Sequence, residues 1–221
     1  MITLHHLENS RSQRIAWLLE ELGLAYQVER YQRQPPNMLA PASLEKVHPL
    51  GKSPVITDDG VTVAESGAII EYLIEQHGGG RLRPDDGTEA RRAYTYWLHF
   101  AEGSMMPLLV MKLVFGRLSG KPIPFFLRPI GKIFATAVEQ SYLGPSLAAQ
   151  LDFIEATLAK QPWFAGDAFT AADIQMSFPL QAAQGRVDLG KYPRIKGWLD
   201  RVEARDGWKQ AVARVGPLEP M

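Results

Sequence analysis

Three short polar segments in the first third of the chain carry side chains that could do chemistry. The first, residues 9–12 (Asn-Ser-Arg-Ser), holds hydroxyl and amide groups that can hydrogen bond to a thiol sulfur. Such a bond, together with the N-terminus of a following helix, favours thiolate over thiol. Lowering a thiol pKa by about two units corresponds to roughly 2.7 kcal/mol, which a charge-assisted hydrogen bond and a helix end can supply. The alternative interpretation is a serine that caps a helix and touches no ligand.

The second segment, residues 52–54 (Lys-Ser-Pro), places Pro54 directly before an expected strand. Only an X-Pro bond has appreciable access to the cis form, which would turn the Ser53 backbone away from the sheet. The amide and carbonyl of Ser53 would then be free to pair with a peptide-like ligand. An ordinary trans proline at the first residue of a strand is the alternative.

The third segment, Glu65-Ser66, stands at the expected start of a helix. The first amides of a helix and its positive end suit a carboxylate, and the carboxylate of Glu65 beside them could hold an ammonium. Together they match the zwitterionic head of an amino acid. The alternative is a plain helix cap.

Apolar periodicity predicts the elements that position these segments. A strand over residues 2–7, a helix with apolar positions over 15–22 and a strand over 25–31 form a β-α-β unit. That order favours a parallel pair joined by a right-handed crossover. Two short strands around an Asp-Gly turn at residues 53–63 predict a hairpin, and a helix over 65–77 follows.

A Gly/Pro-rich linker near residue 80 divides the chain, and no strand pattern recurs after it. Helical spacing returns in four stretches, the first with a bend expected at Pro107 and the second preceded by an expected loop or broken helix over 116–130. These stretches are 88–115, 131–160, 171–184 and 195–213. The sequence therefore predicts an α/β unit followed by an all-α domain.

Composition excludes several functions. The 221 residues include 24 Lys plus Arg and 24 Asp plus Glu, so no overall basic field exists to attract nucleic acid. The absence of cysteine removes disulfides, thiolate metal sites and protein-borne thiol chemistry, so any reactive sulfur must come from a ligand. The N-terminus lacks the features of a signal peptide, and the apolar stretch 105–114 is too short to cross a bilayer. We therefore expect a cytoplasmic protein with no membrane or nucleic-acid partner.

The order and spacing of four motifs resemble the cytosolic glutathione S-transferases, in particular bacterial members of the serine/asparagine type. The motifs are residues 10–24, residues 48–56 (His-Pro-Leu-Gly-Lys-Ser-Pro-Val-Ile), residues 65–73 and residues 164–174. The resemblance covers essentially the whole chain. It implies a thioredoxin-like N-terminal domain over residues 1–79, a linker over about 80–87 and a C-terminal helical bundle over 88–221.

The resemblance also implies how glutathione would be bound. Ser53, before a cis Pro54, would offer its backbone to the cysteinyl part, while Glu65 and Ser66 would hold the γ-glutamyl head. Lys52 would approach the glycyl carboxylate. The loop at residues 39–40 lacks the His or Lys that related enzymes use for that carboxylate.

The thiolate donor implied by the resemblance is Ser10, with Asn9 as the close alternative and Ser12 as a weaker one. The choice stays open because counting back from Arg11 or from Arg14 places the family's catalytic serine at different positions. The lack of cysteine excludes the cysteine-based members of the family, and no tyrosine lies near the first strand.

The implied activity is conjugation of the glutathione thiolate to a small apolar electrophile, a detoxification reaction, by a homodimer that needs no metal. Alternatives are a glutathione-dependent peroxidase or reductase and a non-catalytic glutathione-binding regulatory protein. The electrophile would sit between the domains, against residues 7–9 and 94–111. For the cluster of Trp97, Phe100, Met105 and Met106 in that stretch, plain core packing is the favoured interpretation.

Two histidine features invite a functional interpretation that the sequence does not favour. His5 and His6 alternate within a strand, and we interpret them as an ordinary strand pair. His99 and Glu102 lie one helical turn apart, but two ligands are too few for a closed metal site. We therefore expect no metal.

The helix predicted over 171–184 has its own N-terminal signals. Thr170 and Asp173 predict a capping box, and Phe169 with Ile174 predicts a hydrophobic staple. We assign this motif a structural role only.

Overall fold

A four-stranded mixed sheet organises the first part of the chain in the computed structural model, which describes residues 1–36 and 38–218. The strands are β1 (Ile2–Leu7), β2 (Tyr26–Tyr31), β3 (Val55–Asp58) and β4 (Val61–Ala64), in the spatial order β2-β1-β3-β4. Strands β1 and β2 are parallel, whereas β3 is antiparallel to both β1 and β4. The predicted parallel pair and hairpin are confirmed.

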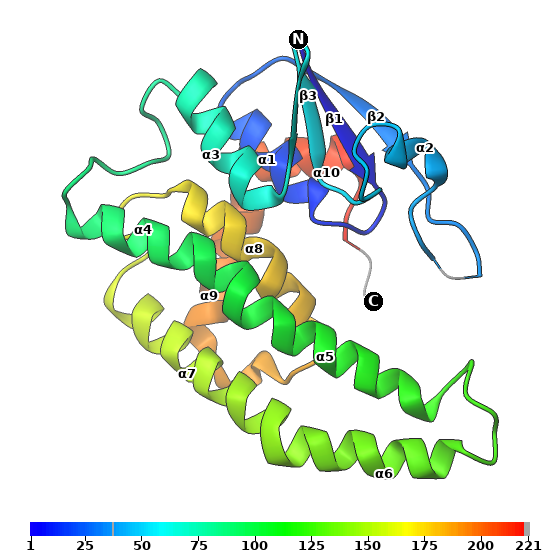
Figure 1. The fold of residues 1–221 in the computed structure, drawn as a ribbon. Helices are drawn as coiled ribbons and strands as arrows, with labels where there is room; N and C mark the ends of the chain where they lie inside the picture. Colours follow the sequence, from blue (N-terminus) through cyan, green and yellow to red (C-terminus); the bar gives the residue numbers. More distant parts are fainter. Residues whose placement is uncertain (37, 219–221) are drawn as a thin grey trace.

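Helices cover both faces of this sheet (Figure 1). Helices α1 (Ser12–Glu21) and α3 (Ser66–His77) pack on the face to which Leu4 points, in the main core. The short helix α2 (Ala42–Glu45) lies on the other face, where Leu7 belongs to a smaller cluster. Side chains that alternate along a strand point to opposite faces, which explains why β1 serves both clusters. This is the thioredoxin-like arrangement that the resemblance implies.

The rest of the described chain is helical, as predicted, and continues from the sheet domain through residues 78–88. Figure 1 shows long helices running away from the sheet domain, with α8 central among them. The last three residues of the expected domain 88–221 lie outside the described residues. The elements are α4 (Glu89–Phe100), η1 (Ala101–Met105), α5 (Met106–Gly116), η2 (Arg117–Ser119), α6 (Arg128–Val138), η3 (Glu139–Leu143), α7 (Gly144–Lys160), α8 (Ala171–Gln184), η4 (Leu189–Lys191), α9 (Pro193–Ala204) and α10 (Asp206–Val215).

The irregularity expected at Pro107 takes the form of a wide turn. Segment η1 is a π-helical turn directly before α5, and Pro107 sits in the first turn of α5, where its missing N–H is tolerated. The expected loop over 116–130 is shorter than predicted, because η2 continues α5 and α6 already begins at Arg128. Pro129 occupies the first turn of α6 for the same reason.

The prediction of a single helix over 195–213 is wrong, because the chain turns at Arg205 between α9 and α10. Arg205 has an extended backbone (φ −68°, ψ 140°), and its guanidinium makes two 2.7 Å hydrogen bonds to the Glu21 carboxylate of α1. The guanidinium also lies 3.7 Å from the centre of the Phe169 ring. These contacts turn α10 onto α1, so the last helix packs against the sheet domain.

One helical stretch among the described residues, Glu89–Ser119, is long and apolar enough by length and composition alone to cross a membrane. The sequence stretch considered, 105–114, was only part of a longer helix. In the fold, one side of this stretch belongs to the core, where Tyr94, Trp97 and Met105 are buried.

The predicted capping box at the start of α8 is confirmed and lies at the centre of the helical domain. The Asp173 carboxylate is fully buried and accepts hydrogen bonds from the amides of Phe164 and Thr170, both at 3.0 Å. It also accepts from the Thr170 hydroxyl at 3.2 Å and from the Trp198 indole at 3.1 Å. Burial raises the pKa of Asp173 to about 6 in spite of these donors. One carboxylate thus joins the loop before α8, the start of α8 and helix α9.

We expect Asp173→Ala to lower the free energy of unfolding by about 2–4 kcal/mol, because it removes a cap and leaves several buried donors without an acceptor. Urea unfolding followed by fluorescence measures this difference. Asp200→Asn, which changes an exposed carboxylate on α9, is the control and should stay within about 0.5 kcal/mol of the parent. Equal stability of the two variants would contradict the role given to Asp173.

Candidate functional site

A cavity of about 460 Å³ opens where the carboxyl end of β1 meets the helical domain. One wall is polar and comes from the loop after β1 and from the segment before β3. The opposite wall is largely apolar and comes from α5 and α8. Lining residues are Leu7, Asn9, Ser10, Arg11, Arg33, Leu39, Ala40, Glu45, Leu50, Gly51, Lys52, Ser53, Met106, Leu109, Val110, Leu113, Phe178, Ala182 and Arg186. Four sequence-predicted site residues, Asn9, Ser10, Lys52 and Ser53, therefore share one cavity.

Ser10 occupies the turn between β1 and α1 and is held by its neighbours. Its hydroxyl oxygen lies 2.7 Å from that of Ser12 and 3.3 Å from that of Ser53, and it accepts the Ser12 amide at 3.3 Å. Asn9, directly before it, has a left-handed backbone (φ 51°), which asparagine tolerates better than most residues. Both residues line the cavity, whereas Ser12 is fully buried behind Ser10.

A hydrogen-bonded chain runs from Ser10 through Ser12 to His6. The Ser12 hydroxyl lies 2.7 Å from His6 Nδ1. The Ser10 hydroxyl donates to the Ser53 oxygen at 3.3 Å, and the Ser12 hydroxyl also lies 3.4 Å from the Leu7 carbonyl. A neutral imidazole has one accepting and one donating nitrogen, so His6 and Ser12 can pair directly. Three hydroxyls and one imidazole are therefore linked at the polar wall.

His5 and His6 point to opposite sides of β1, as their alternation in the strand predicts. His6 faces α1 and ends the chain of hydroxyls behind Ser10, while His5 faces the other way and contacts the Tyr31 hydroxyl at 3.0 Å. Burial, with a smaller contribution from the charge of Arg30, lowers the pKa of His6 to about 4. His6 is thus neutral at pH 7. In the sequence, only the nearby position of Ser12, six residues away at the start of α1, could have indicated this contact.

The segment before β3 has the predicted backbone, because the Ser53–Pro54 peptide is cis. The Ser53 hydroxyl donates to the His5 carbonyl at 3.1 Å and accepts the Leu7 amide at 3.4 Å, which ties it to β1. Pro54 is buried and is not part of the cavity lining, whereas Lys52 is exposed at the cavity edge. The structure therefore brings Ser53 and Ser10 together, with Lys52 near them.

Glu65 and Ser66 stand at the start of α3, outside the lining of this cavity. Neither of the sequence interpretations describes them fully. Glu65 is the N-cap residue but makes no side-chain cap bond, and its backbone is left-handed (φ 72°), which is unusual for a residue other than glycine. The Ser66 hydroxyl is buried and accepts a 2.6 Å hydrogen bond from Arg14 instead of facing outward. Glu65 is exposed, so its carboxylate is accessible.

Arg14, which the sequence reasoning used only for counting, is fully buried between the two halves of the protein. Its guanidinium donates to the Ser66 hydroxyl and to the Gln175 carbonyl, both at 2.6 Å, and forms an ion pair with Glu102. Burial lowers its pKa to about 10, so it stays charged at pH 7. Burial alone would raise the pKa of Glu102. The positive charges of Arg14 and Arg11 and their hydrogen bonds outweigh burial, so the pKa of Glu102 lies below its usual value.

Glu102, considered above with His99 as a metal ligand, has two cationic partners. Glu102 accepts from Arg11 Nε at 3.0 and 3.1 Å in addition to its contact with Arg14, so it serves two cations. No group of three or more metal-binding side chains occurs within residues 1–36 and 38–218.

Two further cationic side chains line the cavity, and the sequence analysis identified neither of them. Arg33 donates to the carbonyls of Glu8, Asn9 and Met38 at 3.0–3.1 Å and so holds the β1–α1 turn against the loop after β2. Arg186 comes from the end of α8. Neither residue belongs to a local motif, since each reaches the cavity from a distant element.

The apolar wall is partly predicted. Met106, Leu109, Val110 and Leu113 of α5 line the cavity, together with Phe178 of α8. The remaining members of the predicted aromatic and methionine cluster, Trp97, Phe100 and Met105, are core residues, in agreement with the favoured interpretation. The contribution of α8 was missed because its apolar residues alternate with polar ones such as Gln175, Ser177 and Gln181 and do not mark one face.

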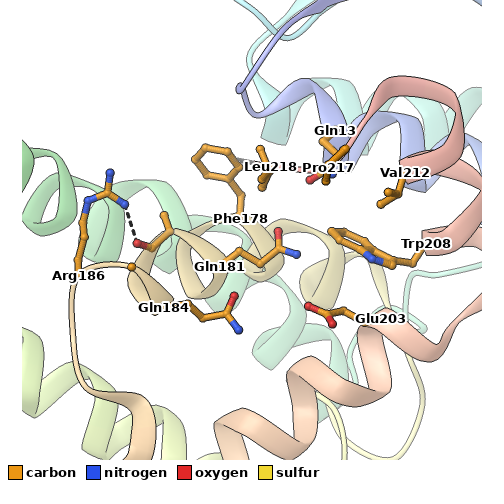
Figure 2. A pocket seen from close by; sticks show the side chains of 12 residues that line it. Gln13, Phe178, Gln181, Gln184, Arg186, Glu203, Trp208, Val212, Pro217 and Leu218 are labelled. Carbon is orange, nitrogen blue, oxygen red and sulfur yellow. Dashed lines mark hydrogen bonds between the residues drawn. The ribbon is translucent and has the colours of Figure 1, made fainter. Parts of the chain in front are cut away.

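A second cavity of about 470 Å³ lies behind Phe178, between α8, α10 and the segment after α10. Figure 2 shows Gln181 and Trp208 in it, with Arg186 bonded to the Ala182 carbonyl. Phe178, Ala182 and Arg186 line both cavities. None of the residues that the sequence nominated lines this second space.

The fold and site define a class: a thioredoxin-like domain with an appended helical domain and a cleft between them that is polar on one side and apolar on the other. Models of the glutathione S-transferase N-terminal and C-terminal domains match residues 10–76 and 121–206. The chain belongs to the glutathione S-transferase family and is a transferase of that family.

Three relatives place the chain within the family. Glutathione S-transferase 3 of Schizosaccharomyces pombe is 40% identical over 216 residues, which cover 97% of this chain and 88% of the relative. The crystal structure of a glutathione S-transferase from Actinobacillus pleuropneumoniae has a TM-score of 0.83 at 32% identity, covering 99% of this chain and 95% of that one. Disulfide-bond oxidoreductase YfcG of Escherichia coli is 28% identical and covers 97% and 95%, respectively.

The low pKa of His6 makes a prediction about stability. Between pH 4 and 6.5 the unfolded chain binds more protons at this residue than the folded protein, so the free energy of unfolding falls as pH falls through that window. Urea unfolding at several pH values should therefore give a shallower pH dependence for His6→Asn than for the parent. Parallel curves would contradict the buried neutral histidine, whatever the stability of the variant at pH 7.

Proposed function

We propose that this protein conjugates glutathione to small apolar electrophiles in the cavity between its two domains. One observation carries the proposal: a single cavity has Asn9, Ser10 and Ser53 on one side and the apolar residues of α5 and α8 on the other. A reaction between a polar tripeptide and an apolar molecule needs both walls within reach of one sulfur atom.

In this proposal glutathione lies along the polar wall. Its cysteinyl part pairs with the backbone of Ser53, next to the cis Pro54 peptide, which puts the sulfur near Ser10. Glu65 takes the γ-glutamyl ammonium, and the first amides of α3 at Ser66 take its carboxylate. Because Ser66 gives its hydroxyl to Arg14, its backbone amide is the group that we assign to binding.

The glycyl carboxylate goes to the cationic rim of the cavity. Lys52 is exposed there, and Arg33 lines the same cavity. Arg33 lies in the loop after β2, close in sequence to the expected position at residues 39–40, and thus supplies a cation that this loop lacks. We propose that Lys52 and Arg33 together replace the missing His or Lys.

Ser10 stabilises the thiolate by turning its hydroxyl proton from the Ser53 oxygen to the sulfur. The Ser12 amide still donates to the Ser10 oxygen, and His6 keeps the Ser12 hydroxyl in place. The thiolate then attacks an electrophilic carbon, forming a C–S bond while the leaving group departs with its electron pair. In an addition to an activated olefin, the carbanion formed takes a proton from solvent instead.

Disulfide reduction is the second candidate, because the relative YfcG is named a disulfide-bond oxidoreductase. A chain without cysteine cannot form a mixed disulfide with its substrate, so two glutathione thiolates must reduce one disulfide and leave as oxidised glutathione. A coupled assay with glutathione reductase and a small alkyl disulfide tests this activity beside the conjugation assay.

Retention on immobilised glutathione without any turnover would favour a regulatory binding protein.

By resemblance we also propose a cytoplasmic homodimer that acts in detoxification. Size-exclusion chromatography with light scattering tests the dimer.

Ser10→Ala should lower kcat/KM with aryl halides roughly tenfold to a hundredfold, the range expected for losing a hydrogen bond to a charged group. It should also move the rising limb of the pH–rate profile to higher pH, because less thiolate forms at neutral pH.

Asn9→Ala, assayed in parallel, should have the smaller effect, and Ser119→Ala, on an exposed 3₁₀ turn outside the cavity lining, should have none. A larger loss in Asn9→Ala than in Ser10→Ala would transfer the thiolate role to Asn9. Unchanged activity in both would refute the assignment.

Arg14→Lys should weaken glutathione binding by about tenfold or more, because an ammonium cannot replace a guanidinium that serves three partners at once. Isothermal titration with glutathione measures the Kd, and steady-state kinetics should show a raised KM for glutathione with a smaller change in kcat. Arg92→Lys, on the exposed side of α4, is the matched control. A folded Arg14→Lys variant that binds glutathione with the Kd of the parent would contradict the proposal that Arg14 positions Ser66 for glutathione binding.

A further inference from the structure

Helix α6 presents its apolar face to solvent. Ile130, Ile133 and Phe134 follow helical spacing on one side, and they are 51%, 68% and 61% exposed. No residue of α6 is buried. The opposite side faces inward at Gly131, where an added Cβ would lie 2.1 Å from the Leu118 carbonyl oxygen. That close approach to η2 fixes which side of α6 points outward.

The exposed apolar surface continues over the loop before α6. Phe125, Phe126 and Leu127 are 77%, 64% and 42% exposed, and the two phenylalanine rings contact each other edge to face at 5.7 Å. Figure 1 shows α5 and α6 projecting together from the helical domain, on the side away from the sheet. We call this surface the hairpin tip; it comprises Val114, Phe125, Phe126, Leu127, Ile130, Ile133 and Phe134.

Only basic charges accompany the hairpin tip. Residues 103–138 contain five cations and no acidic residue, although the whole chain is neutral. Lys112 is neutralised by Glu139, which leaves Arg117, Lys121, Arg128 and Lys132. Within the described part of the chain, none of these four has a carboxylate within ion-pair distance. Arg117, Lys121 and Lys132 are exposed; Arg117 and Lys132 line the groove between α5 and α6, so the cations flank the apolar patch on its neighbouring sides.

An apolar patch of this extent on a protein surface needs a partner, and its charge restricts the choice. A second copy docking through the same surface would bring Arg and Lys against Arg and Lys, which is unfavourable in a two-fold interface. An anionic lipid surface offers hydrocarbon to the phenylalanine and isoleucine side chains and phosphates to the cations. The combination of apolar residues on one helix face with basic residues beside them is typical of interfacial helices.

We propose that the hairpin tip docks the protein reversibly on an anionic lipid surface, with Phe125 and Phe126 entering the boundary between headgroups and acyl chains. The expectation of no membrane partner rested on overall charge and on the absence of a spanning segment, and neither bears on a local patch. Docking of this kind leaves the helices of the core in place, because the tip contributes no residue to the core.

Co-sedimentation with vesicles tests the proposal. The full-length protein should sediment with vesicles of equal parts phosphatidylcholine and phosphatidylglycerol but not with phosphatidylcholine alone, and added salt should release it. The variant Phe125→Ser/Phe126→Ser and the variant Lys121→Glu/Lys132→Glu should each reduce the bound fraction at least several-fold. Their circular dichroism spectra and melting temperatures should match those of the parent, because the altered side chains are exposed.

A matched variant, Lys191→Glu/Lys196→Glu, makes the same charge change on exposed lysines of η4 and α9 and should bind as the parent does. An equal loss of vesicle binding in this control and in Lys121→Glu/Lys132→Glu would overturn the proposal, because it would show that binding depends only on the net charge of the protein. Absence of binding to anionic vesicles would also overturn it. A parent that instead elutes as a larger species than the Phe125→Ser/Phe126→Ser variant, without binding vesicles, would identify the tip as an interface between copies.

Discussion

A single buried cation, Arg14, connects the parts of this protein that must cooperate. Its guanidinium reaches Ser66 at the start of α3, Glu102 in η1 and the Gln175 carbonyl in α8. A fully buried guanidinium is costly unless it is paired and hydrogen bonded, so the position of each partner is constrained by the others. This buried cluster therefore helps to fix the relative placement of the sheet domain and the helical domain, together with the Arg205–Glu21 contact and the shared apolar core.

The donor side of the cavity is arranged by neutral groups. Ser10 is backed by Ser12 and by a neutral His6, so no formal positive charge lies directly behind the proposed sulfur position. A hydroxyl whose acceptor side is already occupied has its proton available to a stronger acceptor. Thiolate stabilisation of this type depends on orientation, and orientation is what the short β1–α1 turn provides.

Local sequence signals predicted much of this arrangement. Apolar periodicity and the Asp-Gly turn predicted the β-α-β unit and the hairpin, and the capping residues Thr170 and Asp173 predicted the start of α8. The sequence could not predict the turn at Arg205, because that turn is stabilised by Glu21, 184 residues away. For the same reason the sequence did not predict that Arg33 lines the cavity or that the Ser66 hydroxyl is buried against Arg14. Each of these features depends on a tertiary contact with a residue distant in sequence.

The π turn η1 has a consequence for how this enzyme could change over time. Such a turn holds one more residue than an α-helical turn, and each residue advances a helix by about 100°. Loss of a single residue from 101–105 would convert η1 into an ordinary α-helical turn and leave α5 facing the same way, because the extra residue is accommodated within that turn. Met106, Leu109 and Leu113 would keep their places in the cavity wall. The wide turn can therefore be gained or lost by a one-codon change while the apolar wall is preserved.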